Sequence, residues 1–256
     1  MRTGTRRLAQ FVVIGVTVAL SAAGRGVWAS GGDAATTVDS EQVVARMVAR
    51  NQERARELEG YRSRRHYHLD YNGILGARQA DMVVDVLYHS PSEKDFEVVS
   101  ESGSKWICNH VLRRLMEVEK ENAQPGARER TEINPANYDF KLLGQEIGPD
   151  GTPYYVLEAE PKTENTYLFR GKVWVEGRDF AVARIEGEPA KNPSRWTKQS
   201  DFHHEYVRLD GIWLPAKNDT LTQLHFLGQS HLTIEYKDYQ VTRAEGTGAD
   251  TGRRGD

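Results

Sequence analysis

The sequence predicts an α+β protein that is mainly β, an incomplete antiparallel barrel in which helices cover the concave face of a curved sheet of about ten strands. Three observations predict this fold. Residues 40–58 and 104–120 have the three- and four-residue apolar spacing of amphipathic helices. Most of the remaining chain alternates apolar and polar residues with a period of two, as strands with one wet face do. Turn signals rich in Gly, Pro, Asn and Asp separate these segments, and none resembles an interdomain linker.

The first helix is expected to begin near Asp39, which can cap it, and to end near Leu58. Its apolar stripe includes Met47, while Arg50 and Arg54 are expected to lie off the stripe. An amphipathic helix of this kind must place one face against another element. We therefore expect it to pack on the sheet.

The second helix interrupts the series of strands. Ile107, Val111 and Leu115 form its apolar stripe, and Cys108 lies beside that stripe, so we expect the thiol to be buried. The polar residues 121–132 that follow predict a loop.

The strands are expected to form one long meander. In the first strand, Tyr61, Arg65 and Leu69 fall on one face, whereas Arg62 and Arg64 fall on the other. The expected strands cover residues 61–71, 79–88, 96–100, 138–146, 154–160, 167–175, 180–186, 198–209, 212–226 and 231–241.

The N-terminus has the features of a secretory signal peptide. A basic start precedes the apolar residues 8–23, and small residues precede a cut after Ala29. An N-terminal membrane anchor is the alternative. Cleavage would remove four arginines and no acid, and would change the net charge from −3 to −7. We expect a periplasmic protein, or a secreted form of it, divided into a signal peptide (1–29), a flexible leader (30–39), a single domain (40–243) and a disordered tail (244–256).

Composition excludes several classes of protein. The 34 Lys and Arg against 37 Asp and Glu give no reason to expect a nucleic-acid partner. One cysteine excludes a disulfide framework and a Cys-rich zinc site. The body of the chain has no apolar run long enough for a polytopic membrane protein. We expect a monomer without a cofactor, a metal or catalytic residues.

Two short patterns leave an enzyme as the alternative from another class. His66 and His68 share a strand face, as in some metal sites, but arginines on the same face favour exposure to solvent. Ser102 and Lys105 match the S-x-x-K string of serine acyl-enzymes, although capping of the following helix also explains a serine here. A small metal- or serine-dependent hydrolase built on these residues remains the alternative.

Two stretches carry a family resemblance. Residues 167–189 contain Trp174-Val175-Glu176, then a tight turn and a basic residue, and residues 210–215 contain a G-x-W-x-P hairpin. Together with the order of elements, they resemble the outer-membrane lipoprotein carrier and lipoprotein-sorting superfamily, the LolA/LolB-like fold. The resemblance extends from residue 40 to residue 241. It implies a partial barrel whose helices close a hydrophobic cavity, and a carrier or chaperone for a lipid or a lipoprotein acyl chain.

The resemblance also implies partners and a lid. The partners would be a lipid or an acylated lipoprotein and an inner- or outer-membrane protein; a periplasmic sensor domain of the same fold is the alternative. Such carriers hold a helical lid with an arginine on an early strand, for which Arg62, Arg64 and Arg65 all remain candidates. The interior is either a filled core or a cavity. The residues expected to line such a cavity are Tyr67, Leu69, Met82, Val84, Val86, Phe96, Ile107, Val111, Leu115, Phe169, Phe202, Tyr206, Leu224 and Phe226.

Overall fold

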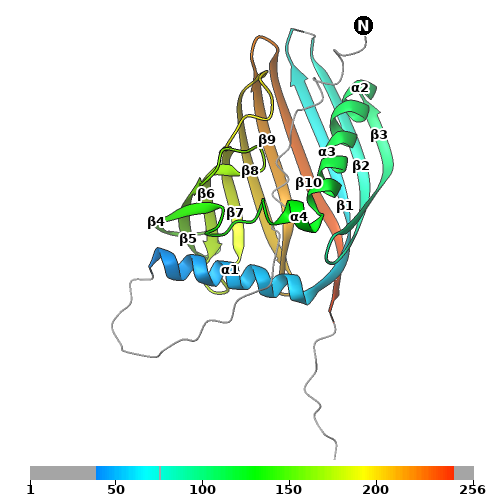
Figure 1. Ribbon diagram of the computed structural model, residues 1–256. Coiled ribbons are helices and arrows are strands. Elements are labelled where there is room, and N and C mark those ends of the chain that lie inside the picture. The colour runs from blue at the N-terminus through cyan, green and yellow to red at the C-terminus, as the bar shows by residue number, and fades with distance from the viewer. Residues whose placement is uncertain (1–38, 75, 245–256) are drawn as a thin grey trace, which may run out of the picture.

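The strands form an open, strongly curved sheet with helices on its concave side (Figure 1). This computed structural model describes residues 39–74 and 76–244. The predicted signal peptide lies outside these ranges, as do the leader and the tail apart from Asp39 and Ala244. The helical elements are α1 (Ser40–Glu57), α2 (Lys105–Ile107), the π-helical turn η2 (Cys108–Leu112), α3 (Arg113–Asn122) and α4 (Pro125–Arg128). The strands are β1 (Leu58–Asn72), β2 (Arg78–His89), β3 (Glu93–Gly103), β4 (Tyr138–Ile147), β5 (Pro153–Pro161), β6 (Phe169–Glu176), β7 (Val182–Pro189), β8 (Thr197–Leu209), β9 (Ile212–Leu224) and β10 (Gly228–Arg243).

The strand order within the described ranges is β3-β2-β1-β10-β9-β8-β7-β6-β5-β4, and each neighbouring pair is antiparallel. The first and last strands therefore pair in the middle of the sheet, while β3 and β4 form its two edges. The sheet does not close, and the helical segment between β3 and β4 connects one edge to the other. This arrangement confirms the predicted incomplete barrel.

Alternation along β1 sets the inner face of the sheet. Tyr67 and Leu69 are buried, whereas His66 before them and Asp70 after them are exposed. Shifts in register interrupt the ladders of β1 with β10, of β2 with β3 and of β4 with β5. Because an irregularity of this kind bends a strand and increases its twist, these shifts favour the curvature of the sheet.

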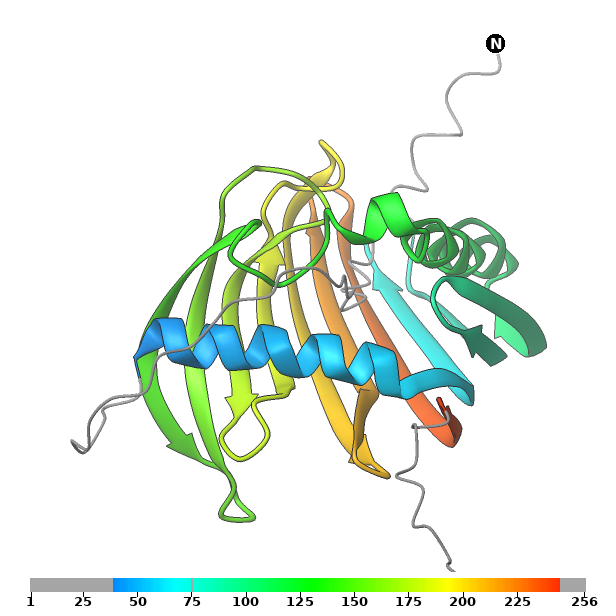
Figure 2. The ribbon, with the colours of Figure 1, turned by 60° about the horizontal axis from the view of Figure 1, so that its bottom comes forward.

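The helices divide the concave face between them. Figure 2 shows α1 lying across the strands, and α3 lying beside β1, β2 and β3. The predicted second helix is present from Lys105 to Asn122, although η2 interrupts its α-helical geometry. The predicted loop contains α4, which the polar composition of residues 121–132 did not indicate. No helix in the described part of the chain is both long and apolar enough to cross a membrane.

Two hydrophobic cores result from this division. The first core joins Val43, Val44 and Met47 of α1 to β4–β8, and includes Phe169. The second core joins α2, η2 and α3 to β1, β2, β9 and β10, and includes the buried thiol of Cys108, as predicted. Each helix buries an apolar stripe on its own part of the sheet. The boundary between the two cores lies under the C-terminal end of α1 and beside α3.

The turn between β9 and β10 corrects one prediction. We expected the strand to continue to Phe226, but β9 ends at Leu224. Phe226 lies in the turn with a φ of 59° and is 90% exposed. The prediction that Phe226 lines the interior is therefore wrong, because the hairpin turns two residues earlier than the period-two pattern indicates.

Candidate functional site

A cavity of about 100 Å³ lies where the two cores meet. It is bounded by the C-terminal end of α1, by α3, and by the inner faces of β1, β8, β9 and β10, with the β2–β3 hairpin at its rim. Its apolar wall includes Leu58, Leu115, Val118, Leu214 and Ile234. Its polar wall is larger than the sequence indicated and consists of Arg54, Tyr61, Arg65, Tyr67, Tyr88, Lys94, Glu119, Asn122, His204, Glu205, Tyr206, Lys217, Asn218 and Tyr236.

A buried ionic cluster fastens α3 to the sheet. Arg65 of β1 forms two hydrogen bonds with Glu119 of α3, from Nη1 to Oε2 at 2.7 Å and from Nη2 to Oε1 at 3.1 Å. Lys94 of β3 donates to the same carboxylate. Arg65 is 1% exposed and Lys94 is 5% exposed, so these charges are almost completely removed from water. Three elements that are distant in sequence therefore meet at one carboxylate.

The electrostatics of this cluster keep Glu119 ionised. Burial alone would raise the pKa of Glu119, but Arg65 and Lys94 outweigh burial and hold that pKa well below its ordinary value. Burial lowers the pKa of Arg65, but Glu119 together with the neighbouring Tyr67, Tyr236 and Tyr61 outweighs burial, and the pKa is raised. Arg65 also lies over the Tyr236 ring, with its guanidinium carbon 4.6 Å from the ring centroid. The cluster is an ion pair with a second cation, held in a tyrosine-rich pocket.

The structure distinguishes the three candidate arginines. Arg65 points inward and contacts α3 through Glu119. Arg64 points outward and pairs with Asp85 at 2.7 Å, and Arg62 is exposed. The period-two pattern had placed Arg65 on the face of Tyr61 and Leu69, and this was the signal in the sequence that could have selected it. Lys94 and Glu119 carried no comparable signal.

His204 of β8 lies in the cavity wall without a partner for one ring nitrogen. It is 6% exposed, and its Nε2 atom has no hydrogen bond within the described ranges. Burial, assisted by the neighbouring His203, lowers the pKa of His204 to about 3. The imidazole is therefore neutral at any pH near 7.

We expect His204 to make the fold sensitive to mild acid. Its folded pKa of about 3 lies below its ordinary value of 6.5, so its contribution to stability is complete above pH 6.5 and is lost as the pH falls toward 3. Urea denaturation between pH 7 and pH 5 should show a falling free energy of unfolding for the wild type and a flatter profile for His204→Gln. His66→Gln removes an exposed imidazole and should keep the wild-type profile. Parallel profiles for all three proteins would contradict the assignment.

The predicted cavity residues separate into three groups. Tyr67, Leu115 and Tyr206 line the cavity. Phe226 is exposed, as described above. The others fill or flank the cores: Leu69, Met82, Val84, Val86, Ile107 and Val111 in the second core, Phe96 packed against it, Phe169 and Phe202 in the first core, and Leu224 buried outside both cores.

Arg54 corrects the predicted orientation of α1. We expected Arg54 to lie off the apolar stripe, but it lines the cavity next to Ala55 and Leu58. Arg50 points instead toward the β8–β9 turn, where Nη2 donates to the Gly211 carbonyl oxygen at 2.9 Å. The two arginines are four residues apart on the same helix, but Arg54 lines the cavity and Arg50 contacts the β8–β9 turn.

The residues of the alternative hydrolase lie on the outer face or at the sheet edge. His68 contacts Asp81 at 2.6 Å and Asp70 at 3.0 Å, and its side chain is 43% exposed. Ser102 and Lys105 are exposed where β3 passes into α2. No group of three or more His, Cys, Asp or Glu residues in the described ranges could hold a metal ion. None of these residues lines the cavity.

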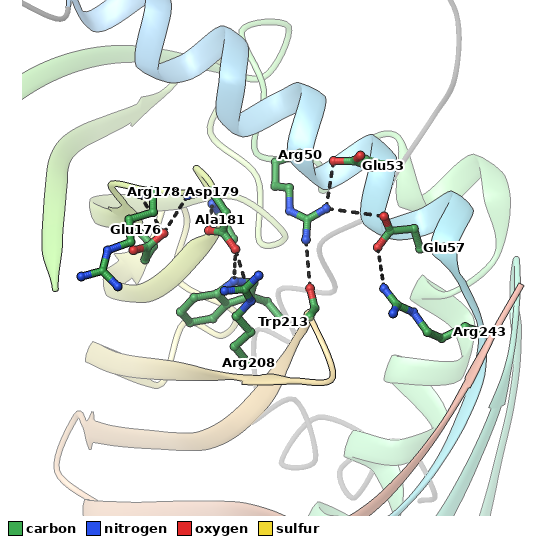
Figure 3. A network of polar contacts seen from close by, with 11 residues as sticks. Arg50, Glu53, Glu57, Glu176, Arg178, Asp179, Ala181, Arg208, Trp213 and Arg243 are labelled. Carbon is green, nitrogen blue, oxygen red and sulfur yellow. Dashed lines mark hydrogen bonds and ion pairs between the residues drawn. The ribbon is translucent and has the colours of Figure 1, made fainter. Parts of the chain in front are cut away.

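Polar contacts fix the C-terminal half of α1 (Figure 3). Besides its bond to Gly211, Arg50 pairs with Glu53 at 2.9 Å, and Arg243 at the end of β10 lies 3.4 Å from Glu57. The Arg50–Glu53 pair lies within α1, whereas the contacts with Gly211 and Arg243 attach α1 to the β8–β9 turn and to the end of β10. The same view shows Trp213 and Arg208 around Asp179, which links the β6–β7 turn to this end of the sheet.

No family model matches the chain, and no curated protein matches it. Several solved structures do. A DUF1329 family protein from Desulfovibrio piger matches 80% of this chain and 94% of its own length, with 14% identity and a TM-score of 0.40. A LolA superfamily protein from Nitrosomonas europaea matches 80% of this chain and 94% of its own, with 11% identity and a TM-score of 0.34.

An outer membrane lipoprotein-sorting protein domain from Vibrio parahaemolyticus matches 81% of this chain and 95% of its own length, with 13% identity and a TM-score of 0.36. The likeness is one of fold. At these identities and TM-scores we base the function on the geometry of this chain.

Proposed function

We propose that the protein is a non-enzymatic periplasmic carrier, which binds a lipid or the acyl chain of a lipoprotein in the concavity between α1 and α3. The observation that carries this proposal is the cavity between the two cores. Leu115 and Val118 of α3 form one side of it, and Leu214 and Ile234 of the sheet line it as well. An acyl chain placed there would be enclosed by apolar side chains of both the helix and the sheet.

The size of the cavity implies that α3 moves when a ligand binds. Ligand pockets usually have volumes of roughly 300–1,000 Å³, and this cavity of about 100 Å³ is smaller. Burial of an acyl chain yields about 0.8 kcal/mol for each methylene group. A chain of sixteen carbons could thus contribute on the order of 10 kcal/mol before the costs of association and of moving the helix.

The contacts of the two helices favour α3 as the part that moves. Its exposed pairs, Arg113 with Glu101 and Lys120 with Asp95, are of the kind that contributes little to stability. Its buried polar attachment is the Glu119 cluster, and Leu115 and Met116 pack in the second core. By contrast, α1 crosses the sheet over the first core and is tied to the strand ends, as Figure 3 shows. Opening of the cavity would therefore break the Glu119 cluster and leave α1 in place.

Uptake of a fluorescent fatty acid by the delipidated protein tests this function. We expect saturable binding by the wild type, because the apolar wall can enclose the chain. Leu115→Trp should weaken binding by about tenfold or more, since the larger side chain would occupy the space that the ligand needs. Leu143→Trp is the matched control, because Leu143 on β4 is 43% exposed and does not line the cavity.

Circular dichroism would establish that both variants are folded. A wild type that binds no fatty acid after delipidation would contradict the proposed function. Equal binding by the wild type and by Leu115→Trp would place the ligand elsewhere.

A further inference from the structure

Arg54 is a cation in the cavity wall without an anionic partner. Its Nε atom is shielded from solvent and has no hydrogen-bond partner, and no carboxylate in the described ranges forms an ion pair with its guanidinium. Burial lowers the pKa of Arg54, but an arginine stays charged at any physiological pH. Arg65 provides a comparison within the same cavity, because its charge is matched by Glu119.

Tyrosines surround Arg54 in place of acids. Tyr61, Tyr88 and Tyr206 line the cavity together with Arg54, and Tyr239 lies near it. The hydroxyls of Tyr88 and Tyr239 donate to backbone carbonyl oxygens at 3.1 and 2.8 Å. Tyr61 and Tyr206 line the cavity, and among the described residues neither hydroxyl has a hydrogen-bond partner. Two hydroxyl donors and one guanidinium are therefore available to a ligand.

The unpartnered ring nitrogen of His204 is a second, independent sign of a polar ligand. His204 and Tyr206 of β8 both line the cavity, on either side of a register irregularity between Glu205 and Tyr206. More than nine-tenths of His204 is buried, and its Nε2 atom lacks a partner in the described part of the chain. Buried polar atoms in proteins are generally hydrogen-bonded, so a nitrogen of this kind beside a cavity points to a bound group.

The charge of the cavity wall has the sign that an anion requires. Four cationic side chains line the cavity, against the two acids Glu119 and Glu205. The chain as a whole carries a net charge of −3. A positive cavity within an acidic protein concentrates its field on a bound anion, particularly where the walls have a low dielectric constant.

We infer that the cavity takes an amphiphile with an anionic head, the carboxylate or phosphate of an acyl lipid, and that Arg54 and Tyr206 bind this head. This inference rests on the proposed function and names the class of ligand. Arg54 is half-buried, and its shielded Nε atom has no partner among the described residues. An anion that accepts bonds from the guanidinium and from a tyrosine hydroxyl offsets the cost of holding this charge away from water. The acyl chain would then extend under α3, along Leu115 and Val118.

Displacement of a neutral fluorescent acyl probe from the delipidated full chain tests the inference. The competitors are dodecanoate with dodecanol, and dodecanoyl lysophosphatidate with monododecanoylglycerol, so that each anion has an uncharged analogue. We expect the wild type to bind each anion about tenfold or more tightly than its analogue, as hydrogen bonds to a charged group allow. The relative affinity of the two anions distinguishes a carboxylate from a phosphate head.

Single substitutions test whether Arg54 is responsible for the preference for anions. Arg54→Gln should remove the preference for the anions and leave the affinity for the uncharged analogues unchanged. Arg56→Gln removes a charge from an exposed position on the same helix and should keep the preference. Tyr206→Phe is a second variant that tests the site of the anionic head, and it retains the ring, so packing changes little. It should weaken the binding of the anions by about three- to tenfold and leave the binding of the uncharged analogues as it is.

Three outcomes separate this inference from the proposed function. Equal affinity of the wild type for an anion and its analogue would overturn the inference, and would leave the carrier function standing. An anion preference that persists in Arg54→Gln would also overturn it. If neither the probe nor any competitor binds the wild type, the proposed function fails and the inference fails with it.

Discussion

Replacement of Glu119 by alanine is expected to lower the free energy of unfolding by about 3–5 kcal/mol, the usual cost of removing one member of a buried ion pair. The substitution leaves Arg65 and Lys94 as two neighbouring cations, 1% and 5% exposed, without a carboxylate. It also removes the buried polar contacts between α3 and the inner face of the sheet, and leaves Leu115 and Met116 in the second core. Urea denaturation followed by circular dichroism measures the change.

Glu117→Ala is the matched control, because Glu117 lies on the same helix and pairs with Arg114 at 2.9 Å on the surface. An exposed pair of this kind contributes less than about 1 kcal/mol. Equal losses in the two variants would show that the Glu119 cluster does not fasten α3.

Phe169→Ala is expected to cost about 3–5 kcal/mol, because it removes a large aromatic ring from a packed core. Phe169 is fully buried in the first core, and its ring lies 5.2 Å from that of Tyr138 and 5.7 Å from that of Phe202, measured between centroids. The same substitution at Phe226 removes a ring that is 90% exposed, and should change stability by less than about 0.5 kcal/mol.

This pair of variants also tests the corrected end of β9. Thermal or urea denaturation is sufficient to compare the two. A large loss of stability in Phe226→Ala would mean that this ring packs against the interior, as the alternation along the strand had predicted.

The strands of the sheet could be predicted from the sequence because the alternation of apolar and polar residues is a local pattern. Alternation along β1 depends only on neighbouring residues, and it placed Arg65 on the inner face with Tyr61 and Leu69. The prediction failed at Phe226, where a turn without a glycine at its centre continues the apolar pattern of the strand. The alternation of residues therefore predicts which side chains share a face of a strand better than it predicts where the strand ends.

The cavity was harder to predict, because it depends on how distant elements meet. Glu119 lies beside the apolar stripe of α3, and Lys94 lies in a strand near a turn, so neither pattern indicates an ion pair. Arg54 lies three residues after Asn51, on the inner side of α1, but its charge suggested the opposite orientation. Most apolar residues predicted to line a cavity instead fill the two cores, because α1 and α3 each cover part of the sheet.

The position of β10 has a consequence for the order in which the molecule can assemble. It pairs with β1 on one side and β9 on the other, and thereby joins the three-stranded unit β1–β3 to the six-stranded unit β4–β9 (Figure 1). Synthesis proceeds from the N-terminus, so the ribosome makes this connecting strand last. Until then β1 and β9 are both open edges, to which other chains can pair. The strand pairing between the two halves of the sheet therefore forms only after residues 228–243 are made, and a chain that ends before Gly228 would lack the strand that connects them.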